Sequence, residues 1–265
     1  MRANTLSLPG SADTPNEDAV AVAADCVVVA DGATARTETG CVHGVSWFAR
    51  QLVDAVVEHC GDPSVALRAA ITQTAESHRE TCDLTDPATP GAAIAVVAAS
   101  ADVVRFLVLG DVTVVVDGDE PAVVVDDRVS HTALAERAIA DALPQGSAEK
   151  AAALVVMKRA ELAARNVPGG FWTAAADPSA VGHAITGTLP RAEVGRVAVL
   201  TDGAARAVDP FALLSWSELL DLLESGGPAD VLSLVRAAEL SDPAGERWTR
   251  NKTSDDATIA YLDLR

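Results

Sequence analysis

The spacing of hydrophobic positions changes several times along this chain, and each spacing predicts a different kind of element. Between residues 43 and 60, apolar side chains recur every three or four positions on one face, which is typical of an amphipathic helix. A second helix is expected directly afterwards, because Asp62 suits the N-cap and Pro63 suits the first helical position. Further helices are predicted at roughly 131–143 and 147–166.

Short apolar runs bounded by turn residues predict β-strands. Residues 19–30 form two such runs, and from Ala92 four more follow, in "AAIAVVAAS", "VVRFLVLGD", "VTVVVDG" and "AVVVDD", which we interpret as an antiparallel meander. Residues 167–194 are irregular, with one or two strands. The last part of the chain predicts a strand in "RVAVLTDG", helices opened by Asp209-Pro210 and by Pro228, and a final strand in "ATIAYLDL".

This order of elements favours a single domain over residues 1–265. Strands occur at both ends of the chain and pairs of helices are inserted between them, with no fixed-period repeat and no low-complexity linker. We therefore expect an α+β domain in which the first and last strands share a sheet.

Composition and charge narrow the environment and the partners. Half of the residues (49%) are hydrophobic, enough for a sizeable core, and the net charge of −18 without any basic run argues against nucleic acid and anionic membranes. The first twenty residues lack the apolar core of a signal peptide, and no later window is apolar enough to span a bilayer, so we expect a soluble, cytoplasmic protein. The sequence leaves the oligomeric state open.

The four cysteines carry no CxxC motif. We expect buried thiols in a reducing compartment and no disulfide framework.

Acidic residues stand beside predicted strands at five separate places. A single Asp-Gly at a strand end is usually a turn. Five such places would converge if the strands lie side by side, and like charges at close range need protonation or bridging cations. All the donors are oxygens, which suits Mg²⁺ or Mn²⁺ and suits Zn²⁺ poorly. The residues concerned are Glu17-Asp18, Asp31-Gly32, Asp111, Asp202 and Asp255-Asp256.

The order of these elements, "NED", a strand with "DG", "LGD", "LTDG" and "DDAT" before a last strand, resembles the metal-dependent protein phosphatases of type 2C. The resemblance spans about residues 5 to 263. It implies a four-layer α-β-β-α sandwich of two mainly antiparallel sheets flanked by helix pairs, with a site for two Mg²⁺ or Mn²⁺ ions at one end. It also implies that the segment of about 129–194 is a variable flap that shapes substrate access. Phe171 and Trp172 are candidate contacts there, although packing in the core is the more common role of such aromatic residues.

The resemblance assigns a role to each acidic position. Asp31 would bridge the two metals, Gly32 would offer its carbonyl oxygen to the second metal, and Asp202 and Asp255 would complete the first.

Glu17 and Asp18 would bind the second metal directly or through water, and Asp111 would hold a third, weaker ion. Asp18, Asp31 and Asp202 are the ligands we predict to be catalytic. The implied reaction is hydrolysis of a phosphate monoester by a metal-activated water, with phosphoserine or phosphothreonine of a phosphoprotein as substrate.

The sequence departs from the family pattern where the substrate phosphate is bound. The arginine usual before the first acidic pair is missing from "SADTPNED", and Ala33 and Val112 replace polar residues. We predict that Arg36, Arg250 or Lys252 binds the phosphate in its place. The alternative is a pseudophosphatase that binds metal and acts as a regulatory interaction module.

Two rival motifs are weaker. The His/Cys pairs Cys41 with His43, His59 with Cys60 and His78 with Cys82 could form a structural zinc site, but their spacing is no recognised ligand pattern, and buried thiols explain them more simply. The run "TVVVDGDE" resembles the first motif of haloacid-dehalogenase-type phosphatases, yet a hairpin with Asp117-Gly118 in its turn fits the apolar flanks better.

Overall fold

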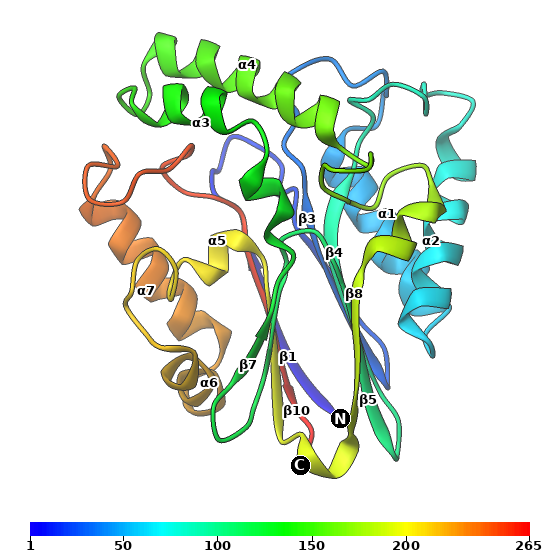
Figure 1. Ribbon diagram of the computed structural model, residues 1–265. Coiled ribbons are helices and arrows are strands. Elements are labelled where there is room, and N and C mark those ends of the chain that lie inside the picture. The colour runs from blue at the N-terminus through cyan, green and yellow to red at the C-terminus, as the bar shows by residue number, and fades with distance from the viewer.

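Two five-stranded antiparallel sheets pack face to face at the centre of the computed structural model, which describes residues 1–265 (Figure 1). The first sheet has the order β1 (Arg2–Leu8), β10 (Ala257–Asp263), β9 (Arg196–Leu200), β6 (Thr113–Val116) and β7 (Ala122–Val124). The second has the order β2 (Ala19–Val22), β3 (Cys26–Gly32), β4 (Ala92–Ala99), β5 (Val103–Leu109) and β8 (Ile185–Pro190).

Helices form the two outer layers. One pair, α1 (Val45–Glu58) and α2 (Pro63–His78), covers the second sheet, and the pair α6 (Trp216–Ser225) and α7 (Pro228–Ser241) covers the first (Figure 1). This arrangement confirms the predicted α+β four-layer sandwich.

The remaining helices lie at or near one end of the sandwich or in connections. In Figure 1 α3 (Leu134–Asp141) and α4 (Ala148–Ala164) lie across the top of both sheets, and the short α5 (Asp202–Ala205) lies below them, directly after β9. Three 3₁₀ turns are η1 (Asp127–His131), η2 (Pro178–His183) and η3 (Arg191–Glu193). No helix combines the length and the apolar character that crossing a membrane requires.

The central strands are apolar on both faces because both faces are covered. In β3, Val27 and Val29 belong to the core between the sheets, whereas Val28 and Ala30 belong to the core under α1 and α2. This alternation follows from the two-residue period of a strand. The two strands predicted within residues 19–30 are therefore confirmed as β2 and β3.

Three predictions about the elements were wrong. Strand β1 was not predicted, and it is β1, not β2, that pairs with the last strand, β10. The four runs after Ala92 are not one meander: β4 pairs with β5 in one sheet and β6 pairs with β7 in the other. No helix of that region begins at Asp209-Pro210; α6 begins at Trp216, where Ser215 and Glu218 form a capping box.

The hairpin interpretation of "TVVVDGDE" agrees with the structure, because β6 and β7 pair antiparallel on either side of Asp117-Gly118.

The expectation of four free thiols was also wrong. Cys26 is bonded to Cys60, and Cys41 is bonded to Cys82, so the structure has no free cysteine. The partners are 34 and 41 residues apart in sequence, and spacing alone did not reveal these pairs. The first bond joins β3 to the segment after α1. The second joins the β3–α1 connection to the segment after α2.

Candidate metal centre

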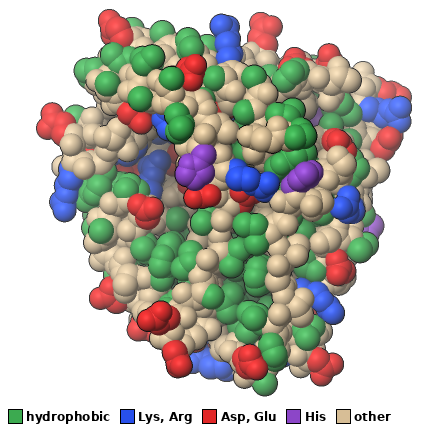
Figure 2. Space-filling model, viewed as in Figure 1, with side chains coloured by type: hydrophobic (Ala, Val, Ile, Leu, Met, Phe, Trp, Pro, Cys, Tyr) green, Lys and Arg blue, Asp and Glu red, His purple; other side chains and the backbone are tan.

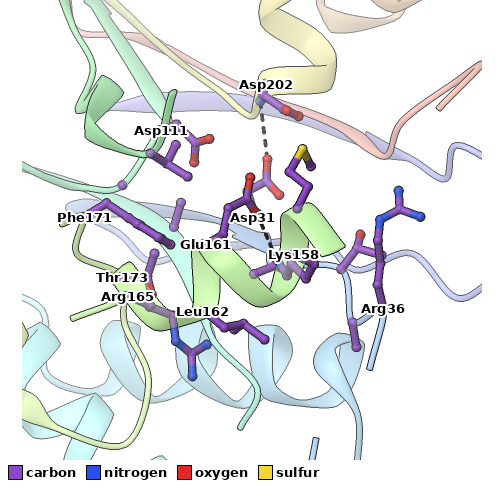
Figure 3. A pocket seen from close by; sticks show the side chains of 18 of the residues that line it. Asp31, Arg36, Asp111, Lys158, Glu161, Leu162, Arg165, Phe171, Thr173 and Asp202 are labelled. Atoms are coloured by element: carbon purple, nitrogen blue, oxygen red, sulfur yellow. Dashed lines mark hydrogen bonds and ion pairs between the residues drawn. The ribbon is translucent and has the colours of Figure 1, made fainter. Parts of the chain in front are cut away.

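Four strand boundaries bring carboxylates to one cavity of about 280 Å³. Asp31 ends β3 and Asp111 follows β5 in the second sheet, whereas Asp202 follows β9 and Asp255 precedes β10 in the first. The backbone N–H of Asp202 donates to the Asp31 carboxylate at 3.4 Å, which links the two sheets directly (Figure 3). The cavity therefore lies at the shared end of the sandwich.

Asp18 and Glu17 lie beside this group, each held by a hydroxyl donor. The Asp18 carboxylate is 5% exposed and accepts hydrogen bonds from Thr201 and Thr258, both at 2.8 Å. Glu17 accepts from Thr34 at 2.5 Å. The N-terminal segment is thereby anchored to the ends of β9 and β10.

Gly32 is required by the close approach of two segments. A Cβ atom at Gly32 would lie 2.4 Å from the carbonyl oxygen of Glu17 and 2.5 Å from the Val45 side chain, so no larger residue fits. Gly203 has the same role on the other sheet, since its Cβ would lie 2.0 Å from the carbonyl oxygen of Asp256. Asp256 itself accepts from the backbone N–H groups of Gly10 and Glu17, at 2.8 and 2.7 Å, and fixes the loop.

Burial and mutual repulsion raise the pKa of several of these carboxyl groups. Burial raises the pKa of Asp18 to about 8, and burial together with Asp202 raises the pKa of Asp111 to about 7. The pKa of Asp31 is raised well above its ordinary value by burial and then by Asp202 and Asp18. The Asp202 side chain is in contact with water in the cavity. Its pKa is nevertheless raised, first because the surrounding protein removes part of its hydration and then because the Asp255 charge repels it.

The donor set fits hard divalent cations. All the converging groups are carboxylates, with the Gly32 carbonyl beside them, and such oxygen ligands suit Mg²⁺ or Mn²⁺. No three of these carboxylates have oxygens within 4.8 Å of one another, a separation that like charges favour. Positive charge among them would relieve the repulsion that raises their pKa values.

Two cations of the chain neutralise only one of the carboxylates. Lys252 Nζ donates to Asp255 at 2.5 Å and to Thr34 at 2.8 Å. Arg206 donates to the other oxygen of Asp255 at 3.1 Å and to the buried Glu239 at 2.7 Å. Arg206 was not predicted. It lies four residues after Asp202 and so faces the same side of the turn, a spacing that could have indicated it.

Of the three predicted phosphate-binding residues, two line the cavity and one does not. Arg36 lines the cavity and makes no hydrogen bond or ion pair within the chain, and Lys252 also lines it. Arg250 does not: it is 7% exposed and pairs with Asp242 at 2.9 Å, away from the cavity, while also donating to backbone carbonyls. The prediction for Arg250 was wrong because its guanidinium is needed to close the turn after α7.

Sequence reasoning missed the basic residues that α4 directs at the cavity. Lys158 points into the cavity, with a side chain only 16% exposed, and its Nζ is 3.8 Å from Glu161 (Figure 3). Burial lowers the pKa of Lys158. Arg165 also lines the cavity, but it donates to the carbonyl oxygens of Pro87 and Thr89, at 2.6 and 2.8 Å, and so fixes the wall.

The two aromatic residues of the 129–194 segment are both largely buried, but they face different hollows. Phe171 is 7% exposed and lines the cavity, where Figure 3 shows it below Asp111. Trp172 stacks on His183 with ring centroids 3.5 Å apart and borders a separate hollow. In Figure 2 charged side chains and histidines form a band across the middle of this face, below α3 and α4.

Comparisons with known proteins agree with this fold. The model of the protein family described as "Protein phosphatase 2C" matches residues 10–233. Among solved structures, a bacterial serine phosphatase superimposes with a TM-score of 0.60 at 14% identity, covering 100% of this chain and 98% of the other.

Two further structures are similar to the same extent. The catalytic domain of the serine/threonine phosphatase PstP, in complex with two manganese ions, has a TM-score of 0.56 at 17% identity and covers 99% of this chain and 97% of that one. Stp1 from Staphylococcus aureus has a TM-score of 0.57 at 13% identity, with coverages of 99% and 94%. A search of the curated proteins found no match.

Proposed function

Because the chain belongs to the protein phosphatase 2C family, we propose that it is a Mg²⁺- or Mn²⁺-dependent phosphatase acting on phosphoserine and phosphothreonine in proteins. The observation that carries the proposal is the convergence of Asp31, Asp111, Asp202 and Asp255 on one cavity from both sheets. A hydrolase of this kind needs clustered oxygen ligands at an accessible site, and this cavity provides them.

In this proposal the carboxylates would be shared among three metal positions. Asp31 would be a ligand of the first and the second metal ion, and Asp202 and Asp255 would complete the first position. The Gly32 carbonyl belongs to the second.

Glu17 and Asp18 would support the second position, and Asp111 would hold a third, weaker ion. Bound Mg²⁺ or Mn²⁺ would lower the pKa of water and neutralise phosphoryl oxygens. Thr201 and Thr258 keep Asp18 in place through their hydroxyl groups. Lys252 and Arg206 fix the orientation of Asp255.

We assign substrate phosphate binding to Lys158 together with Arg36. Lys252 donates to Asp255 at hydrogen-bond distance, whereas Lys158 is 3.8 Å from its nearest acidic partner and Arg36 has none. Both side chains line the cavity that holds the carboxylates. The family usually places an arginine before the position of Glu17, and this chain has none there. Lys158 and Arg36 would supply the positive charge instead.

Hydrolysis of p-nitrophenyl phosphate and of phosphopeptides with Mn²⁺ tests this function. Wild-type protein should hydrolyse phosphoserine and phosphothreonine peptides faster than phosphotyrosine peptides. Asp31→Asn should lower kcat/KM by more than about 100-fold, because it removes a shared ligand. Asp54→Asn, on the exposed face of α1, is the control and should not change it. Equal activity of the Asp31→Asn variant would contradict the proposal.

The rival function is a metal-binding pseudophosphatase that recruits a partner. Two observations favour it: Val112 is fully buried and Ala33 has no polar group, so neither position contributes a donor to the cavity. Stoichiometric Mn²⁺ binding by well-folded protein without hydrolysis of any phosphopeptide would support this rival.

A further inference from the structure

A second set of metal-ligating side chains lies outside the acidic cavity, at the far end of the β3–α1 connection. Cys41, His78 and Cys82 place one ligand atom each within 4.8 Å of the others, and no other group of three His, Cys, Asp or Glu residues does so. The Cys41 sulfur is 3.6 Å from Nδ1 of His78. Cys82 follows His78 by one helical turn, and its backbone N–H donates to the His78 carbonyl at 3.0 Å.

His78 is placed as a ligand would be. It ends α2 and is 2% exposed, its Nδ1 faces the Cys41 sulfur, and its other ring nitrogen, Nε2, is buried without a hydrogen-bond partner. Burial, followed by the proximity of His43, lowers its pKa, so the imidazole is neutral near pH 7, as metal binding requires. The His59 and Cys60 pair of the sequence shows the contrast: Cys60 is bonded to Cys26, and His59 Nε2 lies 3.1 Å from Gln73.

We propose that Cys41, His78 and Cys82, with His43 as the fourth ligand, form a Zn²⁺ site when the Cys41–Cys82 bond is reduced. Two thiolates and two imidazoles are a standard tetrahedral set for zinc, and soft sulfur ligands select zinc over magnesium. His43 Nε2 is 3.1 Å from Thr81 Oγ1, and that oxygen is 3.8 Å from the Cys82 sulfur, so His43 borders the cluster.

The reduced and oxidised forms are related by a balanced two-electron step. A dithiol reductant breaks the S–S bond, gives two electrons and two protons to form two thiols, and itself becomes a disulfide. Zinc binding then displaces the two thiol protons. Oxidation of the thiolates by a disulfide or peroxide rebuilds the bond and releases the ion. In both forms Cys41 and Cys82 are held together, through the disulfide or through the ion. They therefore restrain the β3–α1 connection, whose residues Thr34 and Arg36 line the acidic cavity.

Cobalt binding to the full-length chain tests this site, because thiolate-bound Co²⁺ has a charge-transfer band that carboxylate-bound Co²⁺ lacks. Reduced wild-type protein should show the band and bind one Zn²⁺ that competes with it. Oxidised protein should not show it. Cys41→Ser and Cys82→Ser should each reduce the band to about half or less, the double variant should abolish it, and His78→Gln and His43→Gln should weaken binding by at least about 10-fold.

Two controls separate the cluster from the rest of the molecule. Cys60→Ser opens the other disulfide and should leave the band unchanged, and Asp31→Asn disables the carboxylate site and should also leave it unchanged. Because His78→Gln retains both cysteines, its oxidised form keeps the Cys41–Cys82 cross-link and shows that the variant folds, while its reduced form tests the imidazole as a ligand. Absence of the band in reduced wild-type protein, or its survival at full intensity in Cys41→Ser, would overturn the proposal.

Discussion

Asp18 is kept in a nearly inaccessible position by neutral donors. Two threonine hydroxyls, from the ends of β9 and β10, reach the same carboxylate oxygen, so the side chain can serve as a ligand without a charged partner competing for it. Lys252 and Asp255 show the opposite design, in which a salt bridge orients the ligand at 2.5 Å.

Thr258→Val should therefore weaken Mn²⁺ binding by about 10- to 100-fold with little change in shape, because only a hydroxyl donor is lost. Isothermal titration of Mn²⁺ checks this. Thr253→Val, whose side chain makes no hydrogen bond, is the control, and equal affinities for both variants would contradict the role of Thr258.

Lys158→Ala should lower kcat/KM for a phosphopeptide by about 10- to 100-fold, since a hydrogen bond to a charged group contributes roughly 1.5–3 kcal/mol. Inhibition by inorganic phosphate should weaken in parallel, whereas Mn²⁺ affinity should not fall. Arg159→Ala, on the exposed side of the same helix, is the matched control. Unchanged phosphate inhibition in Lys158→Ala would rule out the phosphate contact.

Elements position these residues through tight junctions at strand ends. β9 is followed almost directly by α5, and only a glycine at position 203 leaves room for the Asp256 carbonyl oxygen. The carboxylates at the ends of neighbouring strands meet because the junctions on both sheets are this close.

Gly203→Ala should lower the free energy of unfolding by about 1–3 kcal/mol or more, since the added methyl would overlap a backbone oxygen that has no room to move. Gly182→Ala is the control, because a Cβ there meets only an arginine side chain at 3.6 Å. Urea unfolding measures the difference. Equal midpoints for the two variants would contradict the packing argument.

The elements and acidic groups that depend on local sequence pattern could be predicted from the sequence. Those that depend on contacts between distant parts of the chain could not. Continuous apolar runs such as β3 and β4 were recognisable because they are covered on both faces, and each acidic residue stands next to such a run. β1 was missed because its sequence, RANTLSL, mixes polar and apolar residues at the sheet edge. Lys158 was missed because nothing local shows that α4 lies over the carboxylates.

At the scale of the whole molecule, several acidic groups lie inside the cavity, where burial makes their ionisation costly. The net charge is −18, and the raised pKa values of Asp18 and Asp111, about 8 and 7, show that the fold resists full ionisation of the cavity. The same charges favour divalent cations.

The metal-free protein should lose stability as the pH rises from about 4 to about 8. The raised pKa values mean that the folded state binds more protons than the unfolded state in this range, so the free energy of unfolding falls as these protons are lost. Mn²⁺ at 100 times its Kd should add about 2.7 kcal/mol per site and reverse the trend. Thermal unfolding with and without Mn²⁺ checks both statements; a metal-free stability that increases over this range would contradict them.

The position of manganese in crystals of this protein tests the central claim most directly. Anomalous scattering from Mn²⁺-soaked crystals should give two strong peaks between Asp31, Asp202, Asp255 and the Glu17–Asp18 segment, and a weaker third peak near Asp111. The same map from Asp31→Asn crystals should lack at least one of the two strong peaks. Peaks only at surface carboxylates, with none among Asp31, Asp202 and Asp255, would contradict the account.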